Sequence, residues 1–160
     1  MLFQGQEFVE SRSFSDSVPL DWGRCERHRG IVQLYRDLVA LRLNRAGATR
    51  GLCGQHVNVH HLDEGGKVLA YHRWERGGPR DDVIVVANFG HRARHNYVVG
   101  LPRGGRWRLR FNGDWQGYNP QFCGTLSGDI SAVDGRYDGM PFHAALTVGP
   151  YSVLVFSQDD

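Results

Sequence analysis

Three carboxylates near the N-terminus are the first side chains whose spacing suggests chemistry: Glu7, Asp16 and Asp21. A pair of carboxylates can serve as acid and nucleophile when a glycosidic bond is cleaved. That reaction needs a fixed separation between the two groups, and these residues fall in a stretch with the composition of a loop. We therefore interpret them as rim or structural residues, including helix caps, rather than as a catalytic set.

The histidines of residues 55–62 raise the question of a metal site. His56 and His60 share one face of an expected strand, and His61 follows directly. Residues four apart on a strand lie roughly 13 Å apart, too far for two imidazoles to bind one ion. We predict solvent-facing histidines, no metal site and no cofactor. The cysteines have no paired spacing, which argues against a zinc site or a disulfide framework: Cys25, Cys53 and Cys123.

Large aromatic residues surround a stretch rich in glycine, asparagine and aspartate. They are Trp107, Trp115, Tyr118 and Phe122. Such rings could stack on sugar rings while polar neighbours bind the hydroxyl groups. The competing interpretation is that they cap a hydrophobic core, as large aromatic side chains commonly do. The sequence leaves both interpretations open, with Trp115 and Tyr118 as the candidates for sugar contact.

One long helix is predicted, over residues 30–44. On a 3.6-residue period its apolar side chains share one face, with Val39 at the margin: Ile31, Leu34, Tyr35, Leu38 and Leu41. This pattern predicts a helix packed on a sheet. Arg42 falls near the middle of the apolar face, so its side chain must extend to solvent or meet a carboxylate.

Before this helix, residues 1–8 begin apolar and indicate the end of a strand. Residues 9–29 are polar and interrupted by Pro19, which predicts a long loop. A strand end, a loop and a helix together form a β–α unit. The other strands of its sheet would have to come from elsewhere.

After the helix the apolar period changes from 3.6 residues toward two. Seven short strands are predicted, over residues 55–62, 67–74, 82–89, 96–101, 107–112, 144–148 and 151–158. Residues 83–87 are apolar without a break, as expected of a central strand covered on both faces. Residues 113–140 lack a clear period and suggest an irregular excursion. The pattern favours a mainly β fold, an antiparallel sandwich with Greek-key connections.

Composition excludes several classes of function. The formal net charge is +2 with acids and bases interspersed, so nucleic-acid binding is disfavoured. No apolar run approaches the length of a membrane span. We predict a cytoplasmic protein without nucleic-acid or membrane partners.

Four segments, taken in order, resemble one known family. They are residues 1–8 (MLFQGQEF), 19–22 (PLDW), 82–89 (DVIVVANF) and 149–158 (GPYSVLVFSQ). Together they are similar to the C-terminal region of family 13 glycoside hydrolases, the α-amylase superfamily, in its glycogen branching enzyme-like members. The resemblance covers essentially the whole chain.

The resemblance implies a domain organisation. Residues 1–46 would be the last strand, loop and helix of a (β/α)8 barrel, and residues 51–160 an all-β C-terminal sandwich. The catalytic aspartate, glutamate and second aspartate of that family would all precede residue 1, so no catalytic residue is carried over. Gln6, Glu7 and Trp22 follow a barrel strand and become candidates for the rim of the glucan cleft.

The function implied is that of a non-catalytic C-terminal part of a retaining enzyme acting on α-1,4-glucans, whose sandwich braces the catalytic barrel. The expected partners are therefore an α-glucan polysaccharide and that barrel. Whether the enzyme hydrolyses or transfers stays open. Two alternatives remain: a standalone glucan-binding module, or a structural domain that docks on a separately encoded barrel.

Overall fold

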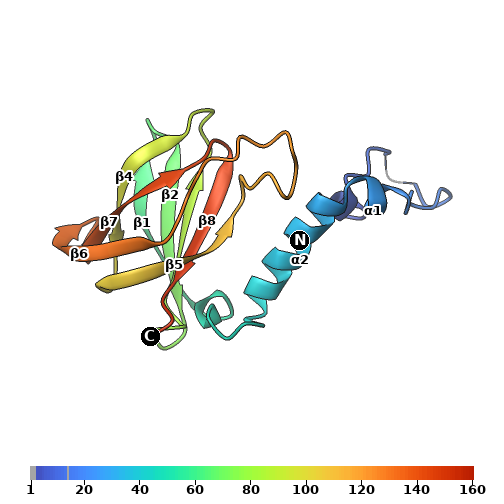
Figure 1. Ribbon diagram of the computed structural model, residues 1–160. Helices are drawn as coiled ribbons and strands as arrows, with labels where there is room; N and C mark the ends of the chain where they lie inside the picture. Colours follow the sequence, from blue (N-terminus) through green and yellow to red (C-terminus); the bar gives the residue numbers. More distant parts are fainter. Residues whose placement is uncertain (1–2, 14) are drawn as a thin grey trace.

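The computed structural model describes residues 3–13 and 15–160. Two α-helices, α1 (Arg24–Arg27) and α2 (Arg29–Arg42), and two short 3-10 helices, η1 (Gln6–Phe8) and η2 (Arg50–Leu52), occupy the first third of the chain. Eight strands follow: β1 (His56–Asp63), β2 (Val68–Trp74), β3 (Val83–Asn88), β4 (Arg94–Leu101), β5 (Gly105–Asn112), β6 (Ile130–Tyr137), β7 (Met140–Val148) and β8 (Ser152–Ser157). Figure 1 shows α2 beside the strands, with α1 at the end of α2 that points away from them; we call residues 3–23 the N-terminal segment.

The strands form one antiparallel sheet in the order β1-β2-β3-β8-β5-β6-β7-β4. Strands β5, β6 and β7 pair in succession and β8 returns to pair with β5, which is a Greek key. The sheet folds over at the short β5–β6 pairing, so that β6, β7 and β4 face the other five strands (Figure 1). The predicted mainly β, Greek-key sandwich is confirmed.

The main core lies between these two layers. Its buried side chains come from strands of both layers and are almost entirely aliphatic, with Trp107 as the largest: Val68, Ala70, Ile84, Val86, Val99, Leu101, Trp107, Ile130, Ala132, Ala144, Leu146, Val148, Leu154 and Phe156. Every residue of β3 is buried. The unbroken apolar run predicted a strand covered on both faces, and this is confirmed.

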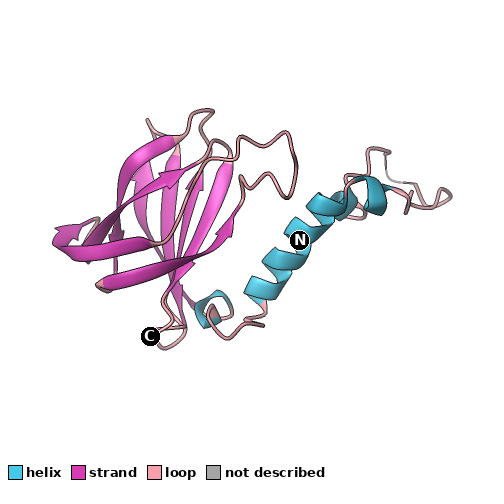
Figure 2. Cartoon of the chain, viewed as in Figure 1, coloured by secondary structure: helices cyan, strands magenta, loops and turns pink. Residues whose placement is uncertain are grey.

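A second apolar cluster covers the outer face of the sheet. Val83, Val85 and Val155 point away from the main core and pack with Leu34 and Leu41 of α2. The helix therefore lies against the sandwich through one side (Figures 1 and 2), but the predicted face is met only in part, because Leu38, expected among its buried residues, is 37% exposed. Arg42 is exposed, so its charge stays in water.

Several regions differ from the sequence-based expectation. Residues 24–27, expected in a long loop, form α1, and β7 begins at Met140 instead of residue 144. Residues 130–137, expected to be irregular, form β6, because Ile130 and Ala132 point inward between polar outward neighbours. Residues 3–8, expected to end a strand, form a turn and the 3-10 helix η1, while residues 1 and 2 lie outside the described part. Gly5 has a φ of 82°, which interrupts an extended backbone.

Gly30 permits the close approach of α2 to the sandwich. A Cβ atom at this position would lie 2.2 Å from the carbonyl oxygen of Tyr118. Alanine for glycine in a helix interior normally stabilises by about 0.5–1 kcal/mol. We expect Gly30→Ala to destabilise instead, by about 1–3 kcal/mol, because the helix must move away.

Urea unfolding of the variant and the parent protein measures this effect. Gly128→Ala is the matched control, since a Cβ atom there would meet nothing within 4 Å. An unchanged or raised stability of Gly30→Ala would show that α2 does not pack as closely as described.

Candidate functional site

Residues 113–129, the platform loop, connect β5 to β6 and lack regular structure, but they are held by specific bonds. The buried carboxylate of Asp114 accepts hydrogen bonds from the backbone N–H groups of Cys123 and Thr125, at 2.9 and 2.8 Å. The side-chain amide of Gln116 donates to the carbonyl of Phe122, at 3.0 Å. These bonds replace the ladder of a sheet and give the loop a defined shape.

Tyr118 anchors the platform loop to both the sheet and α2. It is 7% exposed, its ring stacks on Phe111, and its hydroxyl donates to a carboxylate oxygen of Asp37 at 2.7 Å. Burial, together with this bond, raises the pKa of Tyr118 far above its usual value, so the hydroxyl keeps its proton. Of the two interpretations left open for the aromatic residues, Tyr118 fits the core-capping one.

Trp115 differs from the other aromatic residues of this region. Its side chain is 55% exposed, while its indole packs edge-on against Tyr118 with ring centroids 4.9 Å apart. Trp107, by contrast, is fully buried and donates its indole N–H to the carbonyl of Arg103. Phe122 is half-buried against the outer cluster. The candidate contact with sugar therefore narrows to Trp115.

The three candidate rim residues lie in the N-terminal segment. Gln6 is exposed, and its side-chain oxygen accepts a hydrogen bond from the backbone N–H of Phe3. Glu7 lines a shallow hollow on α2 together with Tyr35. Trp22 is exposed and packs on the buried ring of Phe8 with centroids 5.2 Å apart. Their contact with glucan stays a prediction.

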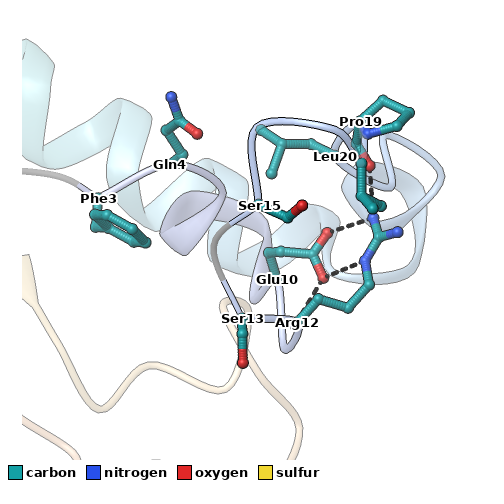
Figure 3. A pocket seen from close by; sticks show the side chains of 9 residues that line it. Phe3, Gln4, Glu10, Arg12, Ser13, Ser15, Pro19 and Leu20 are labelled. Atoms are coloured by element: carbon teal, nitrogen blue, oxygen red, sulfur yellow. Dashed lines mark hydrogen bonds and ion pairs between the residues drawn. The ribbon is translucent and has the colours of Figure 1, made fainter.

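A small cavity of about 50 Å³ in the N-terminal segment is lined in part by Glu10. The Glu10 carboxylate accepts hydrogen bonds from Arg12, whose guanidinium also reaches the carbonyl of Pro19 (Figure 3). The bond with Arg12 holds the pKa of Glu10 well below its usual value. The cavity is too small for a sugar ring, so this cluster shapes the segment rather than binding a ligand.

The N-terminal carboxylates proposed as rim or structural residues have distinct surroundings. Asp21 accepts a hydrogen bond from the backbone N–H of Gly23 and pairs with Arg27, so it stabilises the start of α1. Asp16 is exposed. The N-cap residue of α1 is Gly23 and no side-chain hydrogen bond caps this helix, so Asp21 has a structural role beside α1 but not the capping role that the sequence suggested.

Two histidines differ from their predicted solvent-facing place. His60 is half-buried, with its Nε2 atom 3.1 Å from the carbonyl oxygen of Gly100 in β4. A bulge in β1 between Val59 and His61 turns His61 inward, where it bridges Asp138 at 2.9 Å and the hydroxyl of Tyr97 at 2.7 Å. His61 is therefore buried rather than solvent-facing. Across residues 3–13 and 15–160, no three His, Cys, Asp or Glu side chains are arranged to hold a metal ion, and the cysteines are free thiols.

A surface that the sequence did not single out lies on the edge strand β1. Val57, Val59 and Leu62 point to the outer side of the sheet and are 57–68% exposed; we call these three residues the uncovered face. Edge strands usually carry charged or polar residues there. An outward row of valine and leucine indicates a contact surface.

The uncovered face continues the apolar cluster beneath α2. The strand register aligns Val59 with Tyr71, Val85 and Val155, in one row from β1 to β8. The helix covers only the β3, β8 and β5 part of this row, through Leu34 and Leu41. The same sheet face is thus covered at one end and open at the other.

The architecture is a Greek-key sandwich with one helix on its outer face and an open apolar area beside that helix. This arrangement is that of an all-β domain. Residues 59–159 match the family described as alpha amylase, C-terminal all-beta domain. The chain belongs to this family.

Curated relatives extend the likeness to the helical N-terminal part. A 1,4-alpha-glucan branching enzyme from Roseobacter denitrificans is 32% identical over 164 residues, which cover 100% of this chain and 22% of the relative. A second, from Aquifex aeolicus, is 30% identical over 173 residues, covering 99% of this chain and 26% of the relative. The chain spans about a fifth to a quarter of the length of the curated relatives it matches.

Solved structures show the same fold. Pullulanase type I from Bacillus subtilis, crystallised with maltose, superposes with a TM-score of 0.59 at 19% identity, covering 98% of this chain and 20% of that one. A pullulanase from an Anoxybacillus species gives a TM-score of 0.57 at 17% identity, again covering 98% and 20%. No helix within the described residues is long and apolar enough to cross a membrane.

Proposed function

We propose that this chain is the non-catalytic C-terminal part of an enzyme acting on α-1,4-glucans, of the branching enzyme or α-amylase type, and that its sandwich braces the catalytic barrel. Residues 1–46 would belong to the barrel and residues 51–160 to the sandwich. The whole enzyme would cleave an α-1,4-glucosidic bond through a covalent glycosyl intermediate, in the cytoplasm, with no cofactor. The partners are an α-glucan and the barrel itself.

The observation that carries this proposal is the uncovered face. Val57, Val59 and Leu62 leave aliphatic surface in water at the end of a sheet row that is otherwise buried. Burying such surface contributes about 25 cal/mol per Å², so a partner that covers it gains substantially. A catalytic barrel, to which α2 would also belong, would lie against this same side of the sheet.

The N-terminal segment would then line the glucan cleft. Gln6 and Glu7 belong to η1, and Trp22 packs on Phe8 of the same short helix. Trp22 would offer an exposed ring, and Gln6 and Glu7 hydrogen-bonding groups. These residues would border the substrate without taking part in bond cleavage.

A chimera tests the proposal. This chain replaces the matching segment of the Roseobacter denitrificans branching enzyme, and branching of amylose is followed by the loss of iodine colour. We expect no branching by the chain alone, none by the relative without its segment, and restored branching by the chimera. Branching by the chain alone, or undiminished branching by the shortened relative, would contradict the proposed role.

A further inference from the structure

We propose that Trp115 is the centre of a glucan-binding site on the platform loop, where one face of a glucose unit stacks on the indole. The choice of an α-1,4-glucan as the ligand rests on the proposed function. The site itself is argued from the geometry of the loop and from the hollow beside it.

The indole of Trp115 lies flat on Gly117. A Cβ atom on Gly117 would lie 2.3, 2.4 and 2.5 Å from three neighbouring atoms of the six-membered ring. Such nearly equal distances place that atom above the face of the ring rather than beside its edge. One face of the indole is therefore covered by the backbone of Gly117. Because Trp115 is 55% exposed, we infer that the opposite face is open to solvent.

The ring is also fixed in orientation before any ligand arrives. Tyr118 packs against the indole in a T-shaped contact with an interplanar angle of 87°, and Tyr118 is itself held by Asp37 of α2. Asp114 and Gln116 tie the backbone on both sides of the indole. A preformed aromatic surface loses little conformational freedom on binding, which is what a ligand platform requires.

A hollow of about 320 Å³ lies beside the platform, between the loop and the start of α2. Its walls include His28, Arg29, Gln116 and Asn119. Trp115 does not itself line the hollow, which adjoins the platform through the residues that follow it, Gln116 and Gly117. Small-molecule sites commonly have volumes of about 300–1,000 Å³ and combine aromatic surface with a few polar groups.

The indole face of Trp115 and the polar groups of the nearby hollow together suit a glucose polymer. A glucose ring carries its hydroxyl groups at the rim, so that its faces present mainly C–H groups. The face of an indole has a negative quadrupole and attracts such hydrogens. The hydroxyl groups at the rim of that unit would stay accessible to water and to the loop, while neighbouring glucose units would extend from the indole toward the hollow.

Isothermal titration of the purified chain with maltoheptaose tests this site. We expect Trp115→Ala to weaken binding by at least about tenfold, as removal of a central aromatic contact does. Trp115→Tyr should retain part of the affinity. Gly117→Ala should weaken binding while keeping the indole, because the added methyl group tilts the ring.

Phe89→Ala is the matched control, since Phe89 is a 64% exposed aromatic residue outside the platform loop and should leave affinity unchanged. Thermal unfolding of each variant shows whether its fold is intact. Absence of binding to maltoheptaose, or equal affinity of Trp115→Ala and the parent chain, would overturn the site. Equal affinity for cellohexaose would overturn the assignment to α-linked glucan.

The two proposals can fail separately. Branching by the chimera reports on the bracing role, and binding of maltoheptaose by the isolated chain reports on the site at Trp115. An inactive chimera whose isolated chain still binds maltoheptaose through Trp115 would reject the bracing role and keep the site. An active chimera whose isolated chain shows no Trp115-dependent binding would reject the glucan-binding site and keep the bracing role.

Discussion

Replacing Trp107 with alanine is expected to lower the free energy of unfolding by about 3–5 kcal/mol. The side chain is fully buried at the point where the sheet folds over, since Trp107 pairs with Ile130 across the β5–β6 junction. Its removal leaves a cavity between the two layers and also loses the indole N–H bond to the carbonyl of Arg103, a bond of 3.1 Å.

Urea denaturation followed by circular dichroism measures this loss. Trp115→Ala provides the matched comparison, because the same change at a 55% exposed indole should cost about 1 kcal/mol or less. Similar losses for the two variants would contradict the assignment of Trp107 to the core and Trp115 to the surface.

Asp82 is the second position where a single change should have a large effect. Its buried carboxylate accepts hydrogen bonds from His72 at 2.9 Å, Arg103 at 2.8 Å and the backbone N–H of Gly78 at 2.8 Å. Asp82→Ala would leave these donors without their acceptor. We expect the variant to lose about 3 kcal/mol of unfolding free energy.

The same cluster predicts a dependence of stability on pH. Burial alone would raise the pKa of Asp82, but the hydrogen bonds from His72, Gly78 and Arg103 outweigh burial and lower the pKa below its usual value. A carboxyl group with a lowered folded-state pKa stabilises the protein above its unfolded-state pKa of about 3.9. That contribution disappears as the pH falls through the lower, folded-state value.

Urea midpoints at about pH 6 and about pH 3 test the sign of this effect. The parent chain should be less stable at the lower pH. Asp82→Asn, which keeps the shape of the side chain and removes the titrating group, should lose less stability between the two values than the parent. An equal loss would show that Asp82 does not contribute to the acid sensitivity.

The elements with a strong apolar period could be predicted from the sequence. The helix of residues 30–44 was expected to bury one face on a sheet, and Leu34 and Leu41 do so. The unbroken run of β3 predicted a strand covered on both faces. In both cases local periodicity and tertiary packing agree, so the pattern alone was informative.

Elements that depend on distant partners could not be predicted. β6 was missed because residues 133–137 are exposed and include Asp134, Gly135 and Arg136, which obscure the alternation. His61 was placed on the wrong face because one bulge changes the direction of every later side chain in its strand. Neither feature has a local signal.

The geometry of the candidate site likewise could not be predicted from the sequence. Composition marked the aromatic residues of the platform loop but did not separate the buried Trp107 and Tyr118 from the exposed Trp115. The support of the indole by Gly117 follows from the course of the backbone alone. The uncovered face was missed because alternating valines in a strand are expected whichever layer they face.

The bracing role is tested most directly by the double variant Val59→Glu/Leu62→Glu, studied in the isolated chain and in the chimera with the Roseobacter denitrificans enzyme. Both side chains are more than half exposed in the isolated chain, at 57% and 68%, so the two carboxylates should barely change its unfolding midpoint. In the chimera the barrel would cover them, and we expect a lower melting temperature and loss of branching activity.

Val133→Glu is the control, because Val133 is exposed on β6 and lies away from this face. This variant should leave the melting temperature of the isolated chain and of the chimera unchanged. The measurement is the melting temperature of each variant in each context. We expect a large decrease in melting temperature for the double variant in the chimera and not in the isolated chain. An equal, small decrease in both contexts would contradict the claim that this face braces a catalytic barrel.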